Sequence, residues 1–286
     1  MLTKRVIPTI IVREDKVVQS RSFGDYLPVG TPEIAVKYFS DWGADEIILL
    51  DISVTKSQKE PNFSLIEKCA KKSRVPLTVG GGIGTVDRAK SAFSAGADKV
   101  SINTAASNKL FMEIGELFGA QAVVYSIDVK NINGRYCIYD YKESATTKDS
   151  MAAKIATIDC ELYGELLVQS VDRDGLRGGY DINLLKRAME LSPKPTIALG
   201  GYGKPDHLVQ LFKSTNASAG GIGNAMHHLE HSLVVTKSHS AEMSNIRFET
   251  NASYQDVTLD DLGRIQRRSE TFLDTLFYLK IDKESI

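Results

Sequence analysis

The feature that most constrains the fold of this 286-residue chain is an internal repeat, with its two copies about 120 residues apart. Three pairs of segments carry the repeat: 46–51 with 165–170, 76–84 with 195–203, and 95–106 with 215–226. In the second pair, PLTVGGGIG and PTIALGGYG, both segments end a β-rich run in a glycine cluster. Internal repetition is strong evidence about architecture, because each copy forms one structural unit. The sequence therefore predicts two similar halves related by a pseudo-twofold axis.

Short β-rich apolar runs recur along the chain and predict eight strands. They lie at residues 5–12, 46–51, 76–80, 98–102, 122–128, 165–170, 195–199 and 217–222. Continuous apolar runs are typical of parallel strands that are covered on both faces. Helical patterns lie between them, and eight strands with crossover helices predict an α/β fold, a (β/α)8 TIM barrel of two similar half-barrels. The alternative is a doubly wound open sheet.

Three of the predicted helices have clear start signals, at Thr31, Ser107 and Asp181. Thr31 precedes a proline, which suits the first position of a helix, and Gly43 ends that helix. The predicted inward faces follow the helical period. They consist of Ile34, Ala35, Tyr38, Phe39 and Trp42 in the first helix, Leu110, Phe111, Ile114, Leu117 and Phe118 in the second, and Leu184, Leu185, Ala188 and Met189 in the third.

A hairpin is predicted in the loop after the fifth strand. Asn133-Gly134 stands between two alternating runs, which is a strong signal for a two-residue hairpin turn. Tyr136, Tyr139 and Tyr141 fit the alternation of one hairpin strand. This loop belongs to the face on which barrels keep their chemistry.

The barrel is assigned to residues 1–240, and residues 241–286 to a helical C-terminal extension. Thr258 can cap a helix there, with Asp260 and Asp261 in its first turn. The helix would carry an irregular apolar stripe. Such stripes usually pack on their own core, which favours packing on the barrel over packing on a partner.

Composition excludes several classes of protein. The formal net charge is −1, which does not favour nucleic acid or a membrane surface as a partner. No apolar run reaches the roughly 18 residues of a membrane helix, and the first residues lack the apolar core of a signal peptide. Cys69, Cys137 and Cys160 are too few and too scattered for a disulfide framework or a zinc site. We therefore expect a cytoplasmic protein.

The repeated glycine clusters predict two phosphate sites on opposite sides of the barrel mouth. Each half has a glycine-rich turn after a strand, at 80–82 and 200–201, and then a short polar turn before a helix, at 103–104 and 223–224. Glycine allows close approach of the backbone, and free N–H groups at helix starts attract anions. Gly175, in the segment DRDG, lies close to the second site. A single such turn is often only a tight connection, so the prediction depends on the repetition.

Seven motifs together resemble the cyclase subunit of imidazole glycerol phosphate synthase, the HisF family. They are RVIPTIIV, ADEIILLDI, TVGGGI, ADKVSINTAA, SIDVK, SVDRDGLRGGYD and ALGGYG, and they occur in order from residue 1 to about residue 235. The resemblance implies a (β/α)8 barrel that receives ammonia from a glutaminase docked at the N-terminal ends of the strands. The ammonia would pass through the barrel to a bisphosphorylated substrate at the C-terminal ends. No cofactor is implied.

The resemblance assigns phosphate binding to residues in both halves. At the first site they are Gly82, Asn103 and Thr104; at the second they are Gly175, Gly201, Gly223 and Asn224. Asn224 stands where the family usually has a small residue such as serine.

The implied catalytic site is incomplete. The family has two catalytic aspartates, at the ends of the first and fifth strands; Asp128 matches the second, and Ile11 stands at the position of the first. Gln19 replaces a lysine, and Gln169 and Leu199 replace two small hydroxyl residues near the substrate. An isoleucine cannot exchange protons at any pH, and losing one member of an acid–base pair typically costs about 10²–10⁴ in rate. We therefore expect no efficient imidazole-ring formation.

Several polar residues have two interpretations. Asp128 is either a surviving catalytic carboxylate or an orienting hydrogen-bond acceptor. Asp51 matches a substrate-proximal position and can instead cap the following loop. Asp172 and Asp174 either shape their loop, which is the favoured interpretation, or touch the ligand.

His227, His228 and His231 invite a metal interpretation. Their spacing leaves at most two of them on one face of a helix. No carboxylate or cysteine completes a recognised ligand pattern, so no metal site is expected.

The opposite end of the barrel matches the family closely. Arg5, Glu46, Lys99 and Glu165 match, position by position, the ring of alternating charges through which the family admits ammonia. Asp98 and Gln121 match positions that contact the glutaminase. Charged residues at strand starts are also typical of a solvated surface, so this interpretation depends on the completeness of the match.

A subgroup of HisF-like proteins fits this combination: the WbuZ type, associated with glycosyl amidation in surface-polysaccharide biosynthesis. RVIPTIIV and KEPNFSLIEK, residues 59–68, resemble that subgroup. The implied function is delivery of ammonia for amidation of a (nucleotide-)sugar. The implied partners are a HisH-like glutaminase, an ATP-dependent sugar amidotransferase and a phosphorylated small-molecule or nucleotide-sugar ligand. Two alternatives stay open: the cyclase of histidine biosynthesis with displaced catalytic groups, and a non-catalytic scaffold that activates the glutaminase.

Overall fold

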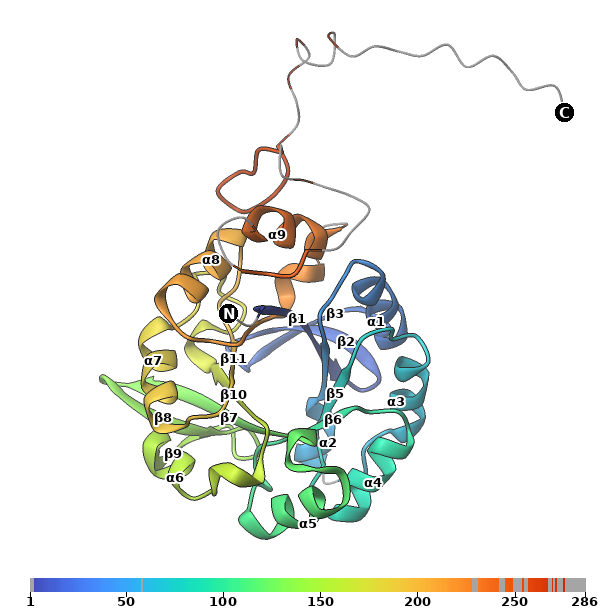
Figure 1. Ribbon diagram of the computed structural model, residues 1–286, viewed down its shortest axis with the longest axis vertical. Coiled ribbons are helices and arrows are strands. Elements are labelled where there is room, and N and C mark those ends of the chain that lie inside the picture. The colour runs from blue at the N-terminus through green and yellow to red at the C-terminus, as the bar shows by residue number, and fades with distance from the viewer. Residues whose placement is uncertain are drawn as a thin grey trace, which may run out of the picture.

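The computed structural model describes residues 3–57, 59–227, 231–241, 245–248 and 257–266, together with 254, 269, 271 and 275. Eight parallel strands form a closed barrel (Figure 1). In order around the barrel they are β1 (Arg5–Arg13), β4 (Ile47–Asp51), β5 (Leu77–Gly80), β6 (Lys99–Ile102), β7 (Val123–Ile132), β10 (Glu165–Ser170), β11 (Thr196–Leu199) and β12 (Ala219–Ile222). The pairing of β12 with β1 and of β7 with β10 completes the circle. The predicted (β/α)8 barrel is confirmed, and the alternative of an open sheet is wrong.

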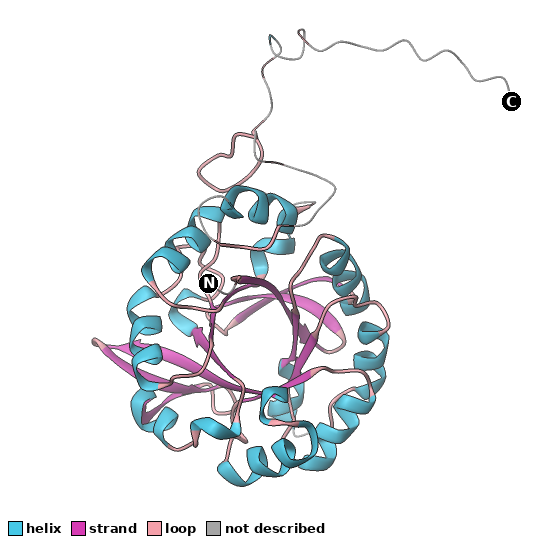
Figure 2. Ribbon diagram, viewed as in Figure 1, coloured by secondary structure: helices cyan, strands magenta, loops and turns pink. Residues whose placement is uncertain are grey.

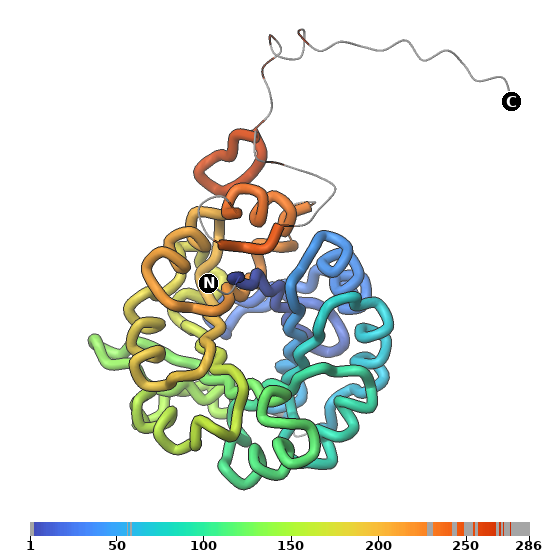
Figure 3. Tube along the Cα trace, in the orientation of Figure 1, coloured from blue at the N-terminus to red at the C-terminus, as the bar shows by residue number. Residues whose placement is uncertain are grey.

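Helices surround the barrel on its outside (Figure 2). They are α1 (Pro32–Asp41), α2 (Ile52–Ser57), α3 (Phe63–Ala70), α4 (Val86–Ser94), α5 (Asn108–Phe118), α6 (Met151–Ala156), α7 (Ile182–Leu191), α8 (Pro205–Ser214) and α9 (Ser232–Ala241). Short 3-10 turns lie at Ala120–Ala122, Cys160–Leu162, Val171–Arg173 and Asn224–His227. The chain runs once around the ring, so that its first strand lies beside its last (Figure 3).

Apolar side chains fill two separate regions. The larger core lies between the strands and the helices. A smaller cluster lies inside the barrel and includes Ile7, Ile48, Val124 and Leu167. Because side chains alternate between the two faces of a strand, each strand serves both regions.

The helix starts are as predicted, but the buried faces differ in part. Thr31, Ser107 and Asp181 are N-cap residues, and the last two accept a hydrogen bond from the backbone N–H three residues on. In α1 the buried residues are Pro32, Val36, Phe39 and Ser40, whereas Ile34 and Tyr38 are 56% and 48% exposed. The predicted inward face of α1 was therefore wrong for Ile34 and Tyr38 and right for Ala35, Phe39 and Trp42, which pack on the core. In α5, likewise, Leu117 is exposed while Phe111 and Ile114 are buried.

Two hairpins extend from the mouth of the barrel. The predicted one is confirmed: β7 pairs antiparallel with β8 (Arg135–Asp140), and Asn133 and Gly134 have φ angles of 49° and 86°. A third strand, β9 (Ala145–Ser150), continues it. The other hairpin, β2 (Lys16–Arg21) and β3 (Asp25–Gly30), was not predicted. Its connection to β1 turns at Glu14-Asp15, both at positive φ, which is not a pair that signals such a turn in sequence.

The internal repeat is visible at the level of single glycines. Gly81 and Gly200, which the repeat superposes, have φ angles of 106° and 96°. A Cβ atom on Gly81 would lie 2.1 Å from the carbonyl oxygen of Asp51, and one on Gly200 would lie 2.6 Å from that of Ser170. Asp51 and Ser170 are themselves a superposed pair. Both glycines are therefore required by the same close approach of backbone, which supports two similar half-barrels.

The described parts of the C-terminal segment pack on the barrel. The backbone of Lys4 donates to the carbonyl of Asn245, and Lys4 pairs with Ile246. His239 contacts the carbonyl oxygen of Val257 through Nε2. A Cβ atom on Gly263 would lie 2.9 Å from Cβ of Lys204, so this turn lies against the barrel.

The helix predicted to begin at Thr258 does not form over residues 258–266, so the prediction is wrong there. These residues form a turn closed by a bridge between Leu259 and Ile265, and Gly263 has a φ of 77°. The side chain of Asp260 accepts hydrogen bonds from the N–H groups of Leu262 and Arg264, which competes with helix formation. Most of the rest of that prediction, including the apolar positions 272, 276 and 279, lies outside the described residues, and the boundary at residue 240 stays a prediction. None of the helices that the structure describes is long and apolar enough to cross a membrane.

Candidate functional site

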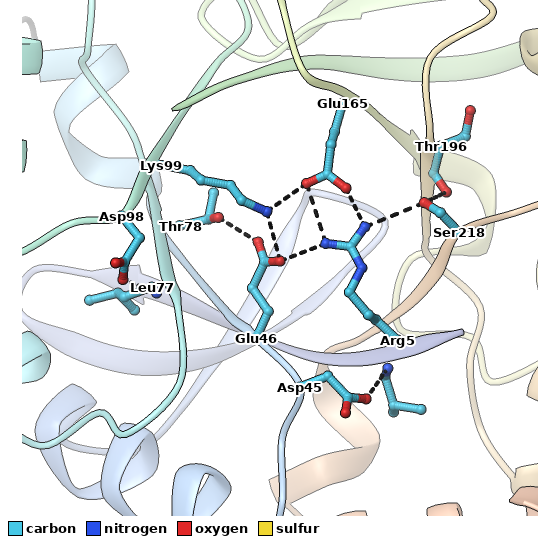
Figure 4. Close-up of polar contacts among 11 residues, drawn as sticks. Arg5, Asp45, Glu46, Leu77, Thr78, Asp98, Lys99, Glu165, Thr196 and Ser218 are labelled. Atoms are coloured by element: carbon cyan, nitrogen blue, oxygen red, sulfur yellow. Dashed lines mark hydrogen bonds and ion pairs between the residues drawn. The ribbon is translucent and has the colours of Figure 1, made fainter. Parts of the chain in front are cut away.

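The N-terminal ends of the strands form the floor of the barrel, and four charged side chains meet there in a closed ring (Figure 4). Arg5 donates through Nη1 to Glu46 (2.7 Å) and pairs through Nη2 with Glu165. Nζ of Lys99 lies 2.9 Å from Oε2 of Glu46 and 2.7 Å from Oε2 of Glu165. The structure thus brings all four predicted gate residues together, from β1, β6, β10 and the residue before β4, with charges that alternate around the ring.

The side chains of the ring are buried or half-buried, so the neighbouring charges affect the pKa values of Arg5 and Glu165. Glu46 is 1% exposed and also accepts a hydrogen bond from Thr78 Oγ1 at 2.6 Å. Burial alone would lower the pKa of Arg5, but its hydrogen bonds and charge interactions with Glu165 and Glu46 raise that pKa above its usual value. Burial would likewise raise the pKa of Glu165, but Arg5 and Lys99 hold it below its usual value. Arg5 and Glu165 are therefore both charged at neutral pH.

Sequence reasoning missed two polar neighbours of the ring. Thr78 bonds Glu46, and Ser218 lies 3.4 Å from Nη2 of Arg5 while donating to the carbonyl oxygen of Thr196. The available signal was the alternation of β5, which places Thr78 on the same inward face as Gly80.

The predicted glutaminase contacts lie at this end of the barrel as well. Asp98 precedes β6, is exposed, and accepts the N–H of Leu77 at 2.8 Å (Figure 4). Gln121 precedes β7, is exposed, and donates to the carbonyl oxygen of Phe118. Both side chains have local structural roles and lie on the face that the ring occupies.

At the opposite end, the C-terminal ends of the strands enclose a cavity of about 470 Å³. Its walls include the apolar Ile11, Leu50 and Ile102, and the hydroxyl residues Ser101 and Ser126. Three aromatic residues from the two hairpins also line it: Phe23 and Tyr26 from the β2–β3 hairpin, and Tyr141 from the loop after β8. None of the three was assigned to the site from the sequence: the β2–β3 hairpin with Phe23 and Tyr26 was not expected, and Tyr141 was interpreted only as part of the alternation of a hairpin strand.

Asp128 lies at the end of β7 in the wall of this cavity and is 9% exposed. Its Oδ2 accepts a hydrogen bond from Nδ2 of Asn103 at 2.9 Å. Burial raises its pKa to about 7, and the bond from Asn103 opposes that shift only in part. A carboxyl group with a pKa near neutrality can donate or accept a proton under ordinary conditions.

Ile11 lines the same cavity from β1, and β1 stands four strands from β7 around the circle of eight. The two positions are therefore on opposite sides of the barrel, as the resemblance implied. Ile11 packs in register with Leu50 of β4 and Val18 of β2. The wall facing Asp128 is thus apolar at this point.

Two further carboxyl groups line the cavity. Asp51 accepts hydrogen bonds from the N–H and the hydroxyl of Ser53, so it caps the following loop as its structural interpretation predicted, and burial raises its pKa. Asp174 accepts from Ser20 Oγ at 2.6 Å and from the N–H of Phe23, and burial raises its pKa to about 6. Asp174 therefore holds the β2–β3 hairpin in place while lining the cavity.

The other departures from the family pattern lie in different places. Gln169 lines the cavity, whereas Leu199 belongs to the apolar cluster inside the barrel. Gln19 lies in β2 opposite Leu27. Asp172 accepts the N–H of Asn131, which agrees with a role in shaping the loop.

The two predicted phosphate sites differ in their access to the cavity. Gly82, Asn103 and Thr104 all line it, next to Arg88, whose Nη1 donates to the carbonyl oxygen of Gly82. The second set comprises Gly175, Gly201, Gly223 and Asn224, and none of these is part of the lining formed by the described residues.

No group of three potential metal ligands occurs among the residues that the structure describes. His231 bonds the hydroxyl of Tyr254 through Nδ1, and the ring of His227 packs on that of Phe39. His228 lies outside the described residues. The two described histidines thus have contacts of an ordinary structural kind.

Comparison with known proteins agrees with the motifs. Residues 5–232 match the family model described as histidine biosynthesis protein. A protein of Vibrio vulnificus, provisionally named imidazole glycerol phosphate synthase subunit hisF2, is 38% identical over 267 residues, which cover 92% of this chain and 98% of the relative. The imidazole glycerol phosphate synthase subunit HisF of Methanocaldococcus jannaschii is 34% identical, covering 85% and 97%. The subunit of the same name from an Exiguobacterium species is 36% identical, also covering 85% and 97%.

Proposed function

The chain belongs to the histidine biosynthesis protein family, and we propose that it is a HisF-type barrel subunit of a glutamine-dependent synthase. In this role the ring of Arg5, Glu46, Lys99 and Glu165 admits ammonia at the floor, and the barrel delivers it to a phosphorylated ligand in the mouth cavity. The observation that carries the proposal is the pairing of a closed charge ring at one end of the barrel with a carboxyl-lined cavity at the other.

The proposed partner is a HisH-type glutaminase that docks on the floor of the barrel. Asp98 and Gln121 are exposed there beside the ring, and their backbone positions are set by the starts of β6 and β7. The names of the relatives, which call each of them a subunit, support the need for a second chain. The cytoplasm is the proposed location, in accord with three free cysteines.

For the reaction in the mouth, the names of the relatives favour imidazole glycerol phosphate formation. Asp128 supplies one carboxyl group with a pKa of about 7, which can act as acid or base. The opposite wall has Ile11, which can do neither. We therefore expect a ring-forming rate roughly 10²–10⁴ below that of a HisF subunit with both carboxylates.

Ile11 is also the one observation that favours a second candidate, amidation of a (nucleotide-)sugar with the help of an ATP-dependent amidotransferase. Amidation by a separate enzyme would require the barrel to deliver ammonia without performing proton transfer of its own. The names of the relatives given above do not point to this reaction, so it is the weaker of the two proposals.

Purified protein incubated with the HisF family's bisphosphorylated substrate and ammonium chloride tests the reaction. Slow but measurable ring formation that is lost in Asp128→Asn supports the first candidate. No product in this assay, together with product from a nucleotide sugar when the glutaminase and amidotransferase are added, supports the second.

The third possibility, a scaffold that only activates the glutaminase, is tested by a separate measurement on Lys99→Ala. If glutamine hydrolysis persists while transfer to the acceptor is lost, the ring serves the passage of ammonia. If hydrolysis and transfer fall only together, passage through the ring has no support.

A further inference from the structure

The hydroxyl group of Thr9 lies inside the barrel and has no hydrogen-bond partner among the residues that the structure describes. Successive side chains of a strand point to opposite faces. On β1, Val6 and Ile10 belong to the core between strands and helices, whereas Ile7 belongs to the apolar cluster inside the barrel. Thr9 therefore points inward, as Ile7 does, and it is only 2% exposed.

Thr9 lies between the charge ring at the floor and the cavity at the mouth. Along β1 the inward side chains are, in order, Arg5 in the ring, Ile7 in the apolar cluster, Thr9, and Ile11 in the wall of the cavity. With a rise of about 3.3 Å per residue, Thr9 is roughly 13 Å along the strand from Arg5 and about 7 Å from Ile11. A molecule that moves from the ring to the cavity therefore passes the level of Thr9.

Apolar side chains surround this level of the barrel. The cluster inside the barrel contains Leu199 and also Ile48, which pairs in register with Thr9. A Cβ atom on Gly221 of β12 would lie 3.3 Å from Oγ1 of Thr9 and 2.9 Å from Cδ1 of Leu199. The hydroxyl group thus lies beside the unsubstituted Cα of a glycine and near an apolar side chain.

Other inward hydroxyl groups reach one of the two ends of the barrel. Thr78 donates to Glu46 of the ring, and Ser101 and Ser126 line the mouth cavity. Thr9 is not part of the lining that the described residues form around that cavity. Its hydroxyl group therefore belongs to the section between the ring and the cavity.

An unpaired hydroxyl group is a cost that the fold does not require at this position. Leaving a buried polar group without a partner destabilises a folded protein, and most such groups are paired. Valine has nearly the same shape as threonine and would fill the position without this cost. Ammonia has N–H donors and one lone pair, so a hydroxyl group can accept from it or donate to it. In an apolar passage ammonia has lost its bonds to water, and a bond to this hydroxyl offsets part of that loss.

We infer that the hydroxyl group of Thr9 is a transient binding site for ammonia inside the barrel. It forms a hydrogen bond with ammonia that has passed the ring, and it lowers the barrier to passage through the apolar section. This inference rests on the proposed function, because it requires ammonia to travel from the floor to the mouth.

The complex with a HisH-type glutaminase tests the inference through the ratio of product formed to glutamine hydrolysed. The acceptor is whichever compound gives product in the assays proposed above. Thr9→Val removes the hydroxyl group and keeps the shape of the side chain. We expect the ratio to fall about two- to tenfold, which is the range that one hydrogen bond contributes. A smaller fall would overturn the inference, and it is also the result expected if a resident water molecule bonds Thr9.

Thr9→Ser separates the hydroxyl group from the packing of the side chain. This variant keeps the hydroxyl group, and we expect its ratio to stay within about twofold of the wild type. A fall as large as that of Thr9→Val would overturn the inference, because packing and not hydrogen bonding would then control passage.

Ser170→Ala is the matched control. Ser170 carries the other buried hydroxyl group without a partner among the described residues. It follows the alternation of Leu166 and Val168, which face the outer core, so it points away from the barrel interior. Its replacement should leave the ratio unchanged.

Thermal unfolding checks the premise that the Thr9 hydroxyl is unpaired. Thr9→Val should unfold at a temperature no lower than the wild type, because it loses no hydrogen bond within the protein. A clearly lower unfolding temperature would overturn the inference, since the hydroxyl group would then have a structural partner.

Failure of this inference is distinguishable from failure of the proposed function. If Lys99→Ala loses transfer while Thr9→Val keeps it, the inference fails and the proposed function stands. If neither variant changes the ratio, or if neither acceptor gives product in the wild-type complex, both fail.

Discussion

At the residue scale, the protein is defined by one carboxyl group that is present and one that is absent. Asp128 is buried in the wall of the mouth cavity with one hydrogen-bond donor, Asn103, and its pKa is raised to about 7. Ile11 packs in the opposite wall without any group that could exchange a proton. The sequence motif predicted both positions, but it did not predict the pKa. The shift depends on burial, which the surrounding strands and hairpins create together.

Replacing Asp128 by Asn should stabilise the protein at high pH. Because the folded state raises the pKa of Asp128, it binds more protons than the unfolded state between about pH 4 and pH 7, so this group's contribution to stability is lost as the pH rises through that range. The asparagine side chain in Asp128→Asn carries no charge at any of these pH values. We therefore expect this variant to gain roughly 1–3 kcal/mol in the free energy of unfolding at pH 8. Urea denaturation of both proteins at pH 5, 6, 7 and 8 measures it.

The gain should shrink toward pH 5, where the carboxyl group of the wild-type protein is protonated. Asp149→Asn, at an exposed position of β9, is the matched control. A gain that is the same at every pH would show that the substitution acts through packing and not through the buried charge.

Glu46 should contribute far more to stability than a surface glutamate in an equally short ion pair. It is almost fully buried and bonds Arg5, Lys99 and Thr78, so Glu46→Gln leaves two half-buried cations with one carboxylate. We expect a loss of about 2–4 kcal/mol in the free energy of unfolding. Urea denaturation measures this loss.

Glu67→Gln is the control, since Glu67 pairs with Lys71 at 2.6 Å on the exposed face of α3 and should unfold like the wild type. If Glu46→Gln and Glu67→Gln changed the free energy of unfolding equally, the ring would contribute no more to stability than a solvated ion pair on the surface.

At the element scale, predictions were right where a local rule applied and failed where tertiary contacts decide. The hairpin at Asn133-Gly134 was predicted because both residues adopt positive φ readily. The β2–β3 hairpin was not predicted, because its position depends on Asp174 and Asn224, which lie more than 150 residues away in sequence. The same distant contacts hold β2 against Asp174 and Asn224 at the mouth. The sequence alone therefore could not show that the two predicted phosphate sites differ.

The turn at Gly134 offers a clean test of the backbone requirement. A Cβ atom on Gly134 or on Gly30 would have no neighbouring atom within 4 Å, but only Gly134 has a positive φ. Gly134→Ala should make the β7–β8 hairpin easier to open, lowering the free energy of local opening by about 1–2 kcal/mol. Gly30→Ala should leave that free energy unchanged. Hydrogen exchange of the β8 amides measures the opening. Equal protection in both variants would contradict the assigned turn.

At the scale of the whole molecule, the repeat relates the two halves both at the floor of the barrel and at its mouth. Glu46 and Glu165, which the repeat superposes, both belong to the floor ring, so the symmetry is kept where the proposed ammonia entrance lies. Among the loops that the structure describes, a hairpin follows the first strand of each half, after β1 and after β7, so the mouth also shows the two halves. The sequence repeat predicted the barrel and the pairs of superposed residues. It could not predict the β2–β3 hairpin, since the hairpin segments are not part of the aligned repeat segments.

The most direct test of the central claim, that ammonia enters through the floor ring, is an isotope competition. The complex with a HisH-type glutaminase is given glutamine labelled with ¹⁵N in the amide, an excess of unlabelled ammonium chloride, and whichever acceptor gives product in the assays proposed above. The account predicts that the product keeps the ¹⁵N label in the wild-type complex and loses most of it in Lys99→Ala. Wild-type product labelled only in proportion to the bulk ammonium pool would contradict the account.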